Sequence, residues 1–325
     1  MPASAAETVR RNVRRDALMR ERRLLSGKTT ACIAETVMRT VRYRRLRVPG
    51  KRTGSRLPLE KTDRRRGMNQ TERRRYLIER LLEEQPQYKK IPIPDSTTEQ
   101  KQLLRSLMNI RAPKEIDDAF AQIQDAYLKQ ENAQRGEVTL EDMRELQPDL
   151  YLWKGDITRL KVGAIVNAAN SGMTGCYQPC HNCIDNCIHT YAGIQLRKYC
   201  GDLMEKQGHE EPSGQAKITP AFNLPCDYVI HTVGPIVRGK LTKEHERLLK
   251  SCYESCLKMA DEHHVKSIAF CCISTGVFCF PNAWAAELAV QTVKEYKKNY
   301  DSDIKVVFNV FKEEDEELYE QQLGK

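Results

Sequence analysis

The sequence predicts an α/β protein: a three-layer α/β/α domain with a mixed central sheet, preceded by a small helical N-terminal region. From about residue 147, short apolar segments alternate with helical stretches, a pattern typical of a sheet covered by helices. Over residues 70–131 the apolar residues recur at helical spacing, and residues 1–67 sustain no hydrophobic period. A length of 325 residues is enough for one large domain or two ordinary ones.

The helical region is expected over 68–140 and the α/β domain over 145–325. RRRYLIERLLEE has leucine and isoleucine at helical spacing, and KKIPIPDS is a proline-rich connection. A second helix is expected to begin at the capping-type Thr97 of TTEQKQLLRSLMNI, and a third has Pro113 near its first turn. The region holds no group of chemically active residues of its own, so we interpret it as a lid or packing cap.

Six apolar segments are the expected strands of the α/β domain. Helical stretches lie between them at 184–204, 243–263 and 282–299. In such sheets, ligands bind at the loops beyond the carboxyl ends of the strands. The expected strands are YLWKGDI, VGAIVNAAN, AKITPAF, DYVIHTV, KSIAFCCIS and IKVVFNVF.

Charge is distributed unevenly. Residues 1–67 hold 20 Lys and Arg against 6 Asp and Glu, whereas the rest holds 33 against 38. The first segment therefore has a net charge of +14 and the rest of the chain −5. That segment is either a basic arm for nucleic acid or an anionic surface, or an unstructured or mis-assigned extension before Met68. We favour the extension, and we do not expect the folded body to bind nucleic acid. Since the sequence has no membrane-length apolar run and no secretory h-region, we expect a cytoplasmic protein.

The stretch GCYQPCHNCIDNCIH (175–189) packs four cysteines and two histidines into fifteen residues. In a long chain without a secretory signal, such crowding indicates reduced thiols and a metal ion rather than disulfides. The stretch lacks the second CxxC or HxxxH pair of a zinc finger. Its one CxxC pair has no thioredoxin-like surroundings.

Four short polar segments follow apolar runs: GDIT (155–158), NAAN (167–170), HTVGP (231–235) and STGVF (274–278). Any one of them alone is most simply a turn. Together they describe a crevice lined by backbone N–H groups and short polar side chains, which suits a diphosphate and a ribose. There is no GxGxxG or Walker A motif, and these loops carry no Lys or Arg.

Taken together, GDIT, VNAAN, CIDNCIHTYAG, YVIHTVGP and FCCISTGVFCFP resemble the macrodomain signature over roughly residues 145–325. Within that family the chain looks most similar to the zinc-containing branch of the MacroD-type ADP-ribosylhydrolases. The family is known for binding ADP-ribose, and this branch for removing mono-ADP-ribose from proteins. The resemblance therefore implies a hydrolase acting on the N- or O-glycosidic bond between ADP-ribose and a side chain, with one Zn²⁺ per chain.

The resemblance also implies roles for individual residues. Asp156 would accept the exocyclic amine of adenine, Asn170 would face the distal ribose, and Phe278 would wall or stack on that sugar. Asp185 aligns with the acidic residue near the scissile C1″ carbon. The implied catalytic residues are Asp185, Asn170 and Asn186. The implied ligand-binding residues are Asp156, Ile157, Asn170, Cys183, Ile184, Asp185, Asn186, Ser274, Thr275, Gly276, Val277 and Phe278.

For the metal, the resemblance implies Cys176, His181 and Cys183, which would leave one coordination position open, as in catalytic zinc sites. Cys180 lies inside the same loop and is an alternative fourth ligand that would close the site. His189 and His231 are interpreted as buried structural histidines, and Asn167 as a structural hydrogen-bonding residue.

The implied substrate is a mono-ADP-ribosylated protein, and the branch is typically paired with a sirtuin-type transferase and a lipoyl-carrier protein resembling glycine-cleavage H protein. Three other functions stay open at this point. The chain could bind ADP-ribose without cleaving it, could deacetylate O-acetyl-ADP-ribose, or could bind nucleic acid through residues 1–67.

Overall fold

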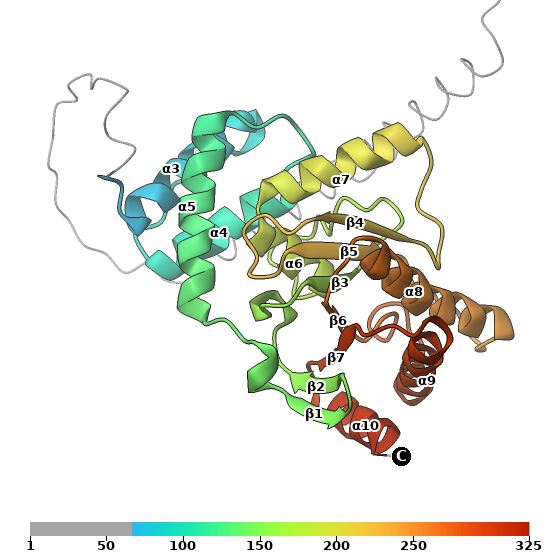
Figure 1. Ribbon diagram of the computed structural model, residues 1–325. Coiled ribbons are helices and arrows are strands. Elements are labelled where there is room, and N and C mark those ends of the chain that lie inside the picture. The colour runs from blue at the N-terminus through green and yellow to red at the C-terminus, as the bar shows by residue number, and fades with distance from the viewer. Residues whose placement is uncertain (1–66, 325) are drawn as a thin grey trace, which may run out of the picture.

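A computed structural model of the protein describes residues 67–324 (Figure 1), so the expectations for residues 1–66 lie outside the described residues. Seven strands form one mixed sheet in the order β1-β2-β7-β6-β3-β5-β4. The inner five are parallel, and the two edge strands are antiparallel to their neighbours. The strands are β1 (Arg144–Gln147), β2 (Leu150–Lys154), β3 (Ala164–Ala168), β4 (Ala216–Pro220), β5 (Tyr228–Thr232), β6 (Ser267–Phe270) and β7 (Lys305–Val310).

Helices cover both faces of this sheet, which confirms the three-layer prediction (Figure 1). On one face, His231 of β5 points towards α7 (Ile194–Gln207), with its Nε2 3.9 Å from the sulfur of Cys200. On the other face, the ring of Phe270 in β6 packs 4.8 Å from that of Tyr253 in α8 (Lys243–Glu262). Two further helices, α9 (Asn282–Tyr300) and α10 (Glu313–Leu323), share the α8 face, and α6 (Ile184–Ala192) shares the α7 face.

The N-terminal helices α3 (Gln70–Glu84), α4 (Thr97–Ile110) and α5 (Asp118–Arg135) bury an apolar core of their own. Leu77, Ile78 and Leu107 are each fully buried there. Burial of one such side chain stabilises the fold by about 1.5–3 kcal/mol. Ile194, at the start of α7, joins this core, so the helical region is docked on the α6 and α7 side of the sheet.

The helix predicted over 184–204 is wrong in one respect, because the chain forms two helices there, separated at Gly193. This glycine has φ +102°, which an L-side chain rarely adopts. A Cβ at this position would lie 2.7 Å from Gln195 Oε1 and 2.8 Å from Gln124 Nε2. The break therefore lets α5 approach the junction of α6 and α7 closely.

Other boundaries also differ from the prediction. The third helix begins at Asp118, not near Pro113, because the Asp117 carboxylate caps it by accepting from Phe120 N at 2.9 Å. In α4, Thr97 is the first helical residue and not the cap. The KSIAFCCIS strand ends at Phe270, so its two cysteines lie beyond the strand.

Strand β1 and helix α10 were not predicted. The sequence of α10 is almost entirely polar, and only Asp315, Tyr319 and Leu323 are buried, one per turn. Such a narrow stripe gives little periodic signal.

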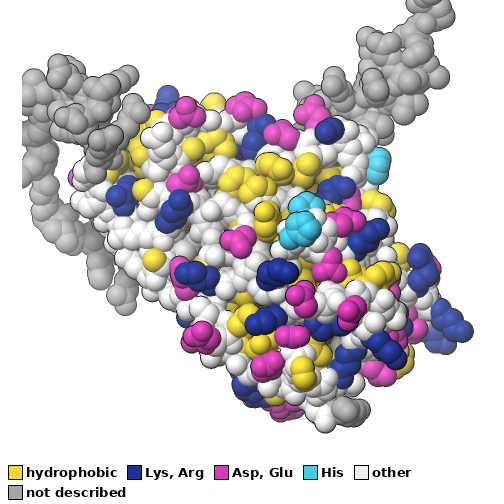
Figure 2. All heavy atoms as spheres, in the orientation of Figure 1, with side chains coloured by type: hydrophobic (Ala, Val, Ile, Leu, Met, Phe, Trp, Pro, Cys, Tyr) yellow, Lys and Arg dark blue, Asp and Glu magenta, His cyan; other side chains and the backbone are white. Residues whose placement is uncertain are grey.

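Among the described residues, no helix is long and apolar enough to cross a membrane. On the face shown in Figure 2, basic and acidic side chains are interspersed over the α/β layers.

Candidate functional site

The four polar segments predicted to form a crevice all lie at the same edge of the sheet, because the strands that they end or follow are parallel. Backbone bonds hold these segments to their neighbours. Ala169 N donates to Thr232 O and Gly155 N to Val310 O, both at 2.9 Å. Gly234 lies so close to Ser274 that a Cβ there would be 2.0 Å from the hydroxyl oxygen. The 231–235 and 274–278 segments therefore touch.

Asp185 lies in the first turn of α6, and its carboxylate is held by two amides. Asn167 donates to Oδ1 at 2.9 Å and Asn170 donates to Oδ2 at 3.2 Å. Asp185 is only 5% exposed, whereas Asn170, which contacts its carboxylate, is exposed, so the carboxylate lies just beneath the surface of the molecule. Burial raises the pKa of Asp185 to about 6, against the opposing effect of the two amides. The structure thus brings Asp185 and Asn170, two residues predicted to be catalytic, into contact.

His231, on the neighbouring strand β5, holds the side chain of Asn167 in place. Its amide nitrogen lies 2.9 Å from Asp185 Oδ1 and 3.1 Å from His231 Nδ1, so it donates one hydrogen to each. His231 Nδ1 must then accept, and its proton is on Nε2, 3.0 Å from Thr219 Oγ1. Burial lowers the pKa of His231 to about 3, which keeps the imidazole neutral.

A second buried group lies behind Asp185 and comprises His189, Cys200 and His231, whose ligand atoms are all within 4.8 Å of one another. Burial raises the pKa of the Cys200 thiol to about 12, so the thiol stays protonated. Both nitrogens of His231 already have partners. His189 packs its ring against Gly175, where a Cβ would lie 2.8 Å from the imidazole, and burial lowers the pKa of His189. These three side chains fill the core behind Asp185, and His231 supports Asn167, which holds the Asp185 carboxylate.

The three predicted metal ligands, Cys176, His181 and Cys183, come together in the loop that precedes α6. Their donor atoms all lie within 4.8 Å of one another, and Cys176 Sγ is 3.7 Å from His181 Nδ1. The hydrogen bond from Cys183, aided by His181, lowers the pKa of Cys176 to about 5. The same sharing of one proton raises the pKa of Cys183. Two clustered sulfurs and an imidazole nitrogen are the ligand types that Zn²⁺ prefers, so these residues fit such an ion.

Cys180 does not join this group. It has a left-handed backbone, with φ +53°, and its thiol faces α4, 3.2 Å from Ser106 Oγ and 3.5 Å from Gln102 O. Its orientation therefore does not match that of a fourth ligand.

Asn186, the third residue predicted to be catalytic, is fully buried, and its amide contacts the 176–183 loop. The nitrogen donates to Gln178 O at 2.9 Å and to Cys176 O at 3.4 Å. The oxygen accepts from Arg105 of α4 at 3.0 Å. These contacts make Asn186 a support for the loop.

Asp156, predicted to meet adenine, is paired with a residue that the sequence did not suggest. Arg135, at the end of α5, forms an ion pair with its Oδ2 and donates to Thr158 Oγ1 at 2.8 Å. The guanidinium also lies 3.6 Å from the centre of the Tyr191 ring. Ile157, beside Asp156, is buried.

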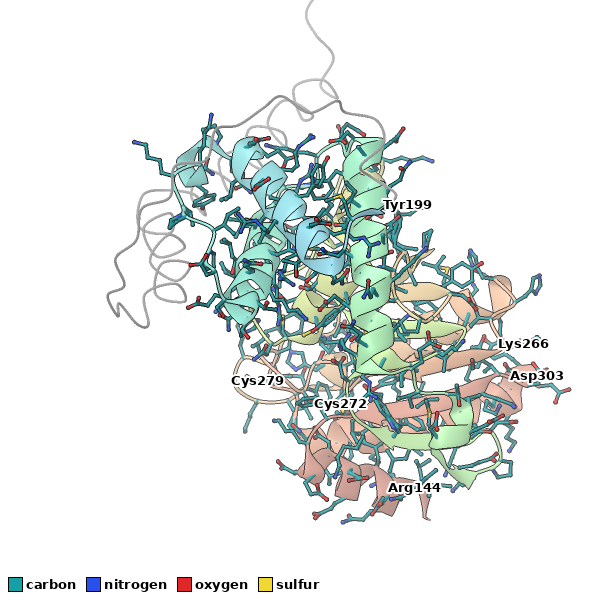
Figure 3. The ribbon with its side chains drawn as sticks, turned by 90° about the vertical axis from the view of Figure 1, so that its left-hand side faces the viewer. Arg144, Tyr199, Lys266, Cys272, Cys279 and Asp303 are labelled. Carbon is teal, nitrogen blue, oxygen red and sulfur yellow. The ribbon has the colours of Figure 1, made fainter. Side chains whose placement is uncertain are left out.

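The 274–280 loop presents free backbone donors. Within the described part of the chain, the N–H groups of Gly276, Val277 and Phe278 donate to no other residue. Ser274 and Cys279 have positive φ, of +66° and +57°, which curls the loop. Figure 3 labels Cys279 on this loop near the edge of the molecule and Cys272 deeper, beyond the end of β6. Successive free N–H groups in a curled loop form a concave site for an anion.

Three arginines around the site were missed by sequence reasoning: Arg105 and Arg135 of the helical region and Arg197 of α7. Arg197 is 3% exposed, and it donates to the carbonyls of Cys176 at 3.2 Å and Arg111 at 3.0 Å. The helical region, expected to be a lid or packing cap, thus places two side chains in contact with predicted site residues. All three lie outside the recognised motifs, so no local signal marked them.

Comparison with known proteins agrees with this geometry. Residues 166–289 match the Macro domain family. The chain is 60% identical over 248 residues to a protein-ADP-ribose hydrolase of Treponema medium, which covers 75% of this chain and 95% of the relative. It is 46% identical over 251 residues to a protein-ADP-ribose hydrolase of Staphylococcus aureus strain MSSA476, covering 76% and 93%.

A solved structure extends the similarity to three dimensions. The Trypanosoma brucei macrodomain in complex with ADP-ribose is 27% identical, with a TM-score of 0.53 over 71% of this chain and 97% of that chain. The similarity of this chain to that structure, and to the two sequence relatives, covers a much longer stretch than residues 166–289.

Proposed function

The chain belongs to the macrodomain family, and we propose that it is a protein-ADP-ribose hydrolase. Water would cleave the bond between C1″ of the distal ribose and an amino-acid side chain. The oxygen of water ends on C1″ as a hydroxyl with one hydrogen, and the other proton goes to the atom of the side chain that leaves. The observation that carries this proposal is the Asp185 carboxylate, buried at the crevice and held by Asn167 and Asn170.

We propose that ADP-ribose lies along the carboxyl edge of the sheet. Asp156 and Ile157 would contact adenine, the free N–H groups of residues 276–278 would bind the diphosphate, and Phe278 would contact the distal ribose. The diphosphate would meet backbone donors of a curled loop, an arrangement that suits phosphate without any Lys or Arg in that loop.

The distal ribose would then meet Asn170 and Asp185. Cleavage at C1″ passes through a transition state with oxocarbenium character, as in other glycoside hydrolyses. The Asp185 carboxylate would stabilise the positive charge that develops there and orient the attacking water. A charge held in place by two amides needs little rearrangement during the reaction, which is the basis of electrostatic catalysis.

We propose that Cys176, His181 and Cys183 hold a zinc ion beside this site. When bound, the ion would supply Lewis-acid chemistry with one coordination position open. Cys183 caps α6, and its sulfur accepts from Asn186 N at 3.4 Å, so this ligand and the Asp185 turn belong to one local structure.

The substrate is, on this proposal, a mono-ADP-ribosylated protein. The specific substrate suggested by the family resemblance is a lipoyl-carrier protein modified by a sirtuin-type transferase. Its modified side chain would enter beside the 175–183 loop, which flanks Asp185.

The proposal is tested by incubating the full chain with a mono-ADP-ribosylated protein and, separately, with O-acetyl-ADP-ribose. Free ADP-ribose from the first substrate, at a rate above that of deacetylation, is the expected result. No release, with ADP-ribose bound tightly in calorimetry, would instead make the protein an ADP-ribose-binding module. Faster deacetylation would move the assignment to the acetylated nucleotide.

A further inference from the structure

The loop from Cys176 to Cys183, here called the metal loop, rests on helix α4 of the N-terminal region. We propose that Arg105 of α4 is a positioning residue for this loop and sets how tightly the ion is held. The inference rests on the metal site of the proposed function and adds to it a residue more than 70 positions away in sequence.

Arg105 joins the end of the metal loop to the start of α6 through one nitrogen. Its Nη2 donates to His181 O at 2.6 Å and to Asn186 Oδ1 at 3.0 Å. It also lies 3.6 Å from Cys187 Sγ. One planar guanidinium therefore fixes the backbone of a metal ligand relative to the helix that carries Asp185.

The contact is part of a continuous face of α4. The side chains of Arg105, Ser106 and Asn109 follow helical i, i+1, i+4 spacing, and all three contact the 180–190 region. The main-chain carbonyl of Gln102 adds a contact with the Cys180 thiol. Asn109 accepts from Cys180 N at 3.0 Å and donates to Thr190 Oγ1 at 3.0 Å. Side chains at this spacing lie on one side of a helix, so α4 presents a polar surface matched to the loop.

The loop has few bonds of its own to hold its shape. His181 N donates to Gln178 O at 3.3 Å, and Asn186 holds Gln178 O and Cys176 O. Cys180 has a left-handed backbone, an energetically unfavourable conformation for this residue type. Contacts from outside must therefore keep the ligands together, with Arg197 holding the Cys176 end and Arg105 the His181 end.

Groups that orient metal ligands in this way typically contribute about 10- to 100-fold to metal affinity. We therefore expect Arg105→Ala to weaken zinc binding by about 10- to 100-fold. Arg105→Lys keeps the charge but lacks the guanidinium plane that places Nη2 between the His181 and Asn186 oxygens, so a smaller loss is expected.

The matched control is Arg80→Ala. Arg80 lies in the same helical region, and it pairs with Asp117 at 2.7 Å on the surface, away from the metal loop. Zinc affinity would be measured on each full-length variant by competition with a chromophoric chelator at pH 7. The absorption spectrum of the cobalt-substituted protein would report on ligand geometry directly, and far-UV circular dichroism of each metal-free variant would check the fold.

The expected result is a 10- to 100-fold weaker zinc affinity and altered cobalt bands for Arg105→Ala, with Arg80→Ala unchanged. Wild-type affinity and spectrum in Arg105→Ala would overturn the inference, as would an equal loss in Arg80→Ala. If Arg105→Ala does not fold, an unchanged affinity in Arg105→Lys overturns it instead. A wild-type chain that binds no zinc yet releases ADP-ribose would also overturn it and leave the hydrolase assignment standing.

Discussion

Acid should destabilise the protein through His231, the buried imidazole that supports Asn167 and, through it, Asp185. In the folded chain His231 Nδ1 accepts from Asn167, so a proton placed there would face another N–H donor. Burial lowers its pKa to about 3, whereas an unfolded histidine titrates near 6.5. A lowered folded-state pKa means that the stabilisation is complete above about pH 6.5 and is lost as the pH falls towards about 3.

The size of this effect follows from the two pKa values. Between pH 7 and pH 5, the linkage relation gives a loss of about 2 kcal/mol from His231 alone. His189 acts in the same direction, since its pKa is also lowered by burial. Asp185 acts in the opposite direction, because its pKa is raised to about 6 and its protonation favours the folded chain. A difference between wild type and a His231 variant removes these other contributions.

The assay is urea unfolding of the metal-free protein at pH 7 and pH 5, in the wild type and in His231→Gln. A chelator is present throughout, because protonation of the metal ligands would add a pH dependence of its own. The wild type should lose about 2 kcal/mol more between the two pH values than His231→Gln does. An equal loss of unfolding free energy in both proteins would refute the tautomer and the hydrogen bonds assigned to His231.

Two further changes have defined outcomes. Arg135→Ala should weaken ADP-ribose binding by about fivefold in calorimetry and leave zinc affinity unchanged. The reason is that a partly exposed ion pair that orients Asp156 contributes about 1 kcal/mol. Unchanged ADP-ribose affinity would count against a role for this ion pair in the adenine site. Gly193→Ala should lower the free energy of unfolding by about 1–3 kcal/mol, because its φ of +102° suits only glycine and the added Cβ would meet Gln124 and Gln195. Gly239→Ala, with φ +93° but open space around it, should cost less in the same urea titration, and an equal cost would argue against close packing at Gly193.

Much of the α/β domain could be predicted from its sequence, because its strands are nearly continuous apolar runs. Ala164, Ile165 and Val166 of β3 are all fully buried, as expected for a parallel strand covered on both faces. Prediction failed where tertiary contacts override local pattern. Gly193 ends α6 inside an otherwise helical stretch, and α10 buries only one residue per turn.

The site was predictable only as far as its local motifs extend. Cys176, His181 and Cys183 are close in sequence, and the structure brings their donor atoms together. Arg105 and Arg135 contact site residues from more than 20 positions away, on helices whose sequences resemble ordinary amphipathic surface. A long-range contact leaves no trace in residue spacing, so the contribution of the helical region to the site became visible only in three dimensions.

The measurement that tests the central claim most directly is ADP-ribose release from a mono-ADP-ribosylated protein by the wild type and by Asp185→Asn, with ADP-ribose affinity measured on the same preparations. Asparagine keeps the shape of the side chain and removes the negative charge. We expect turnover to fall by at least about 100-fold. The dissociation constant should stay within about threefold, since the residues proposed to contact adenine and the diphosphate are unchanged. Full turnover by Asp185→Asn would contradict the account.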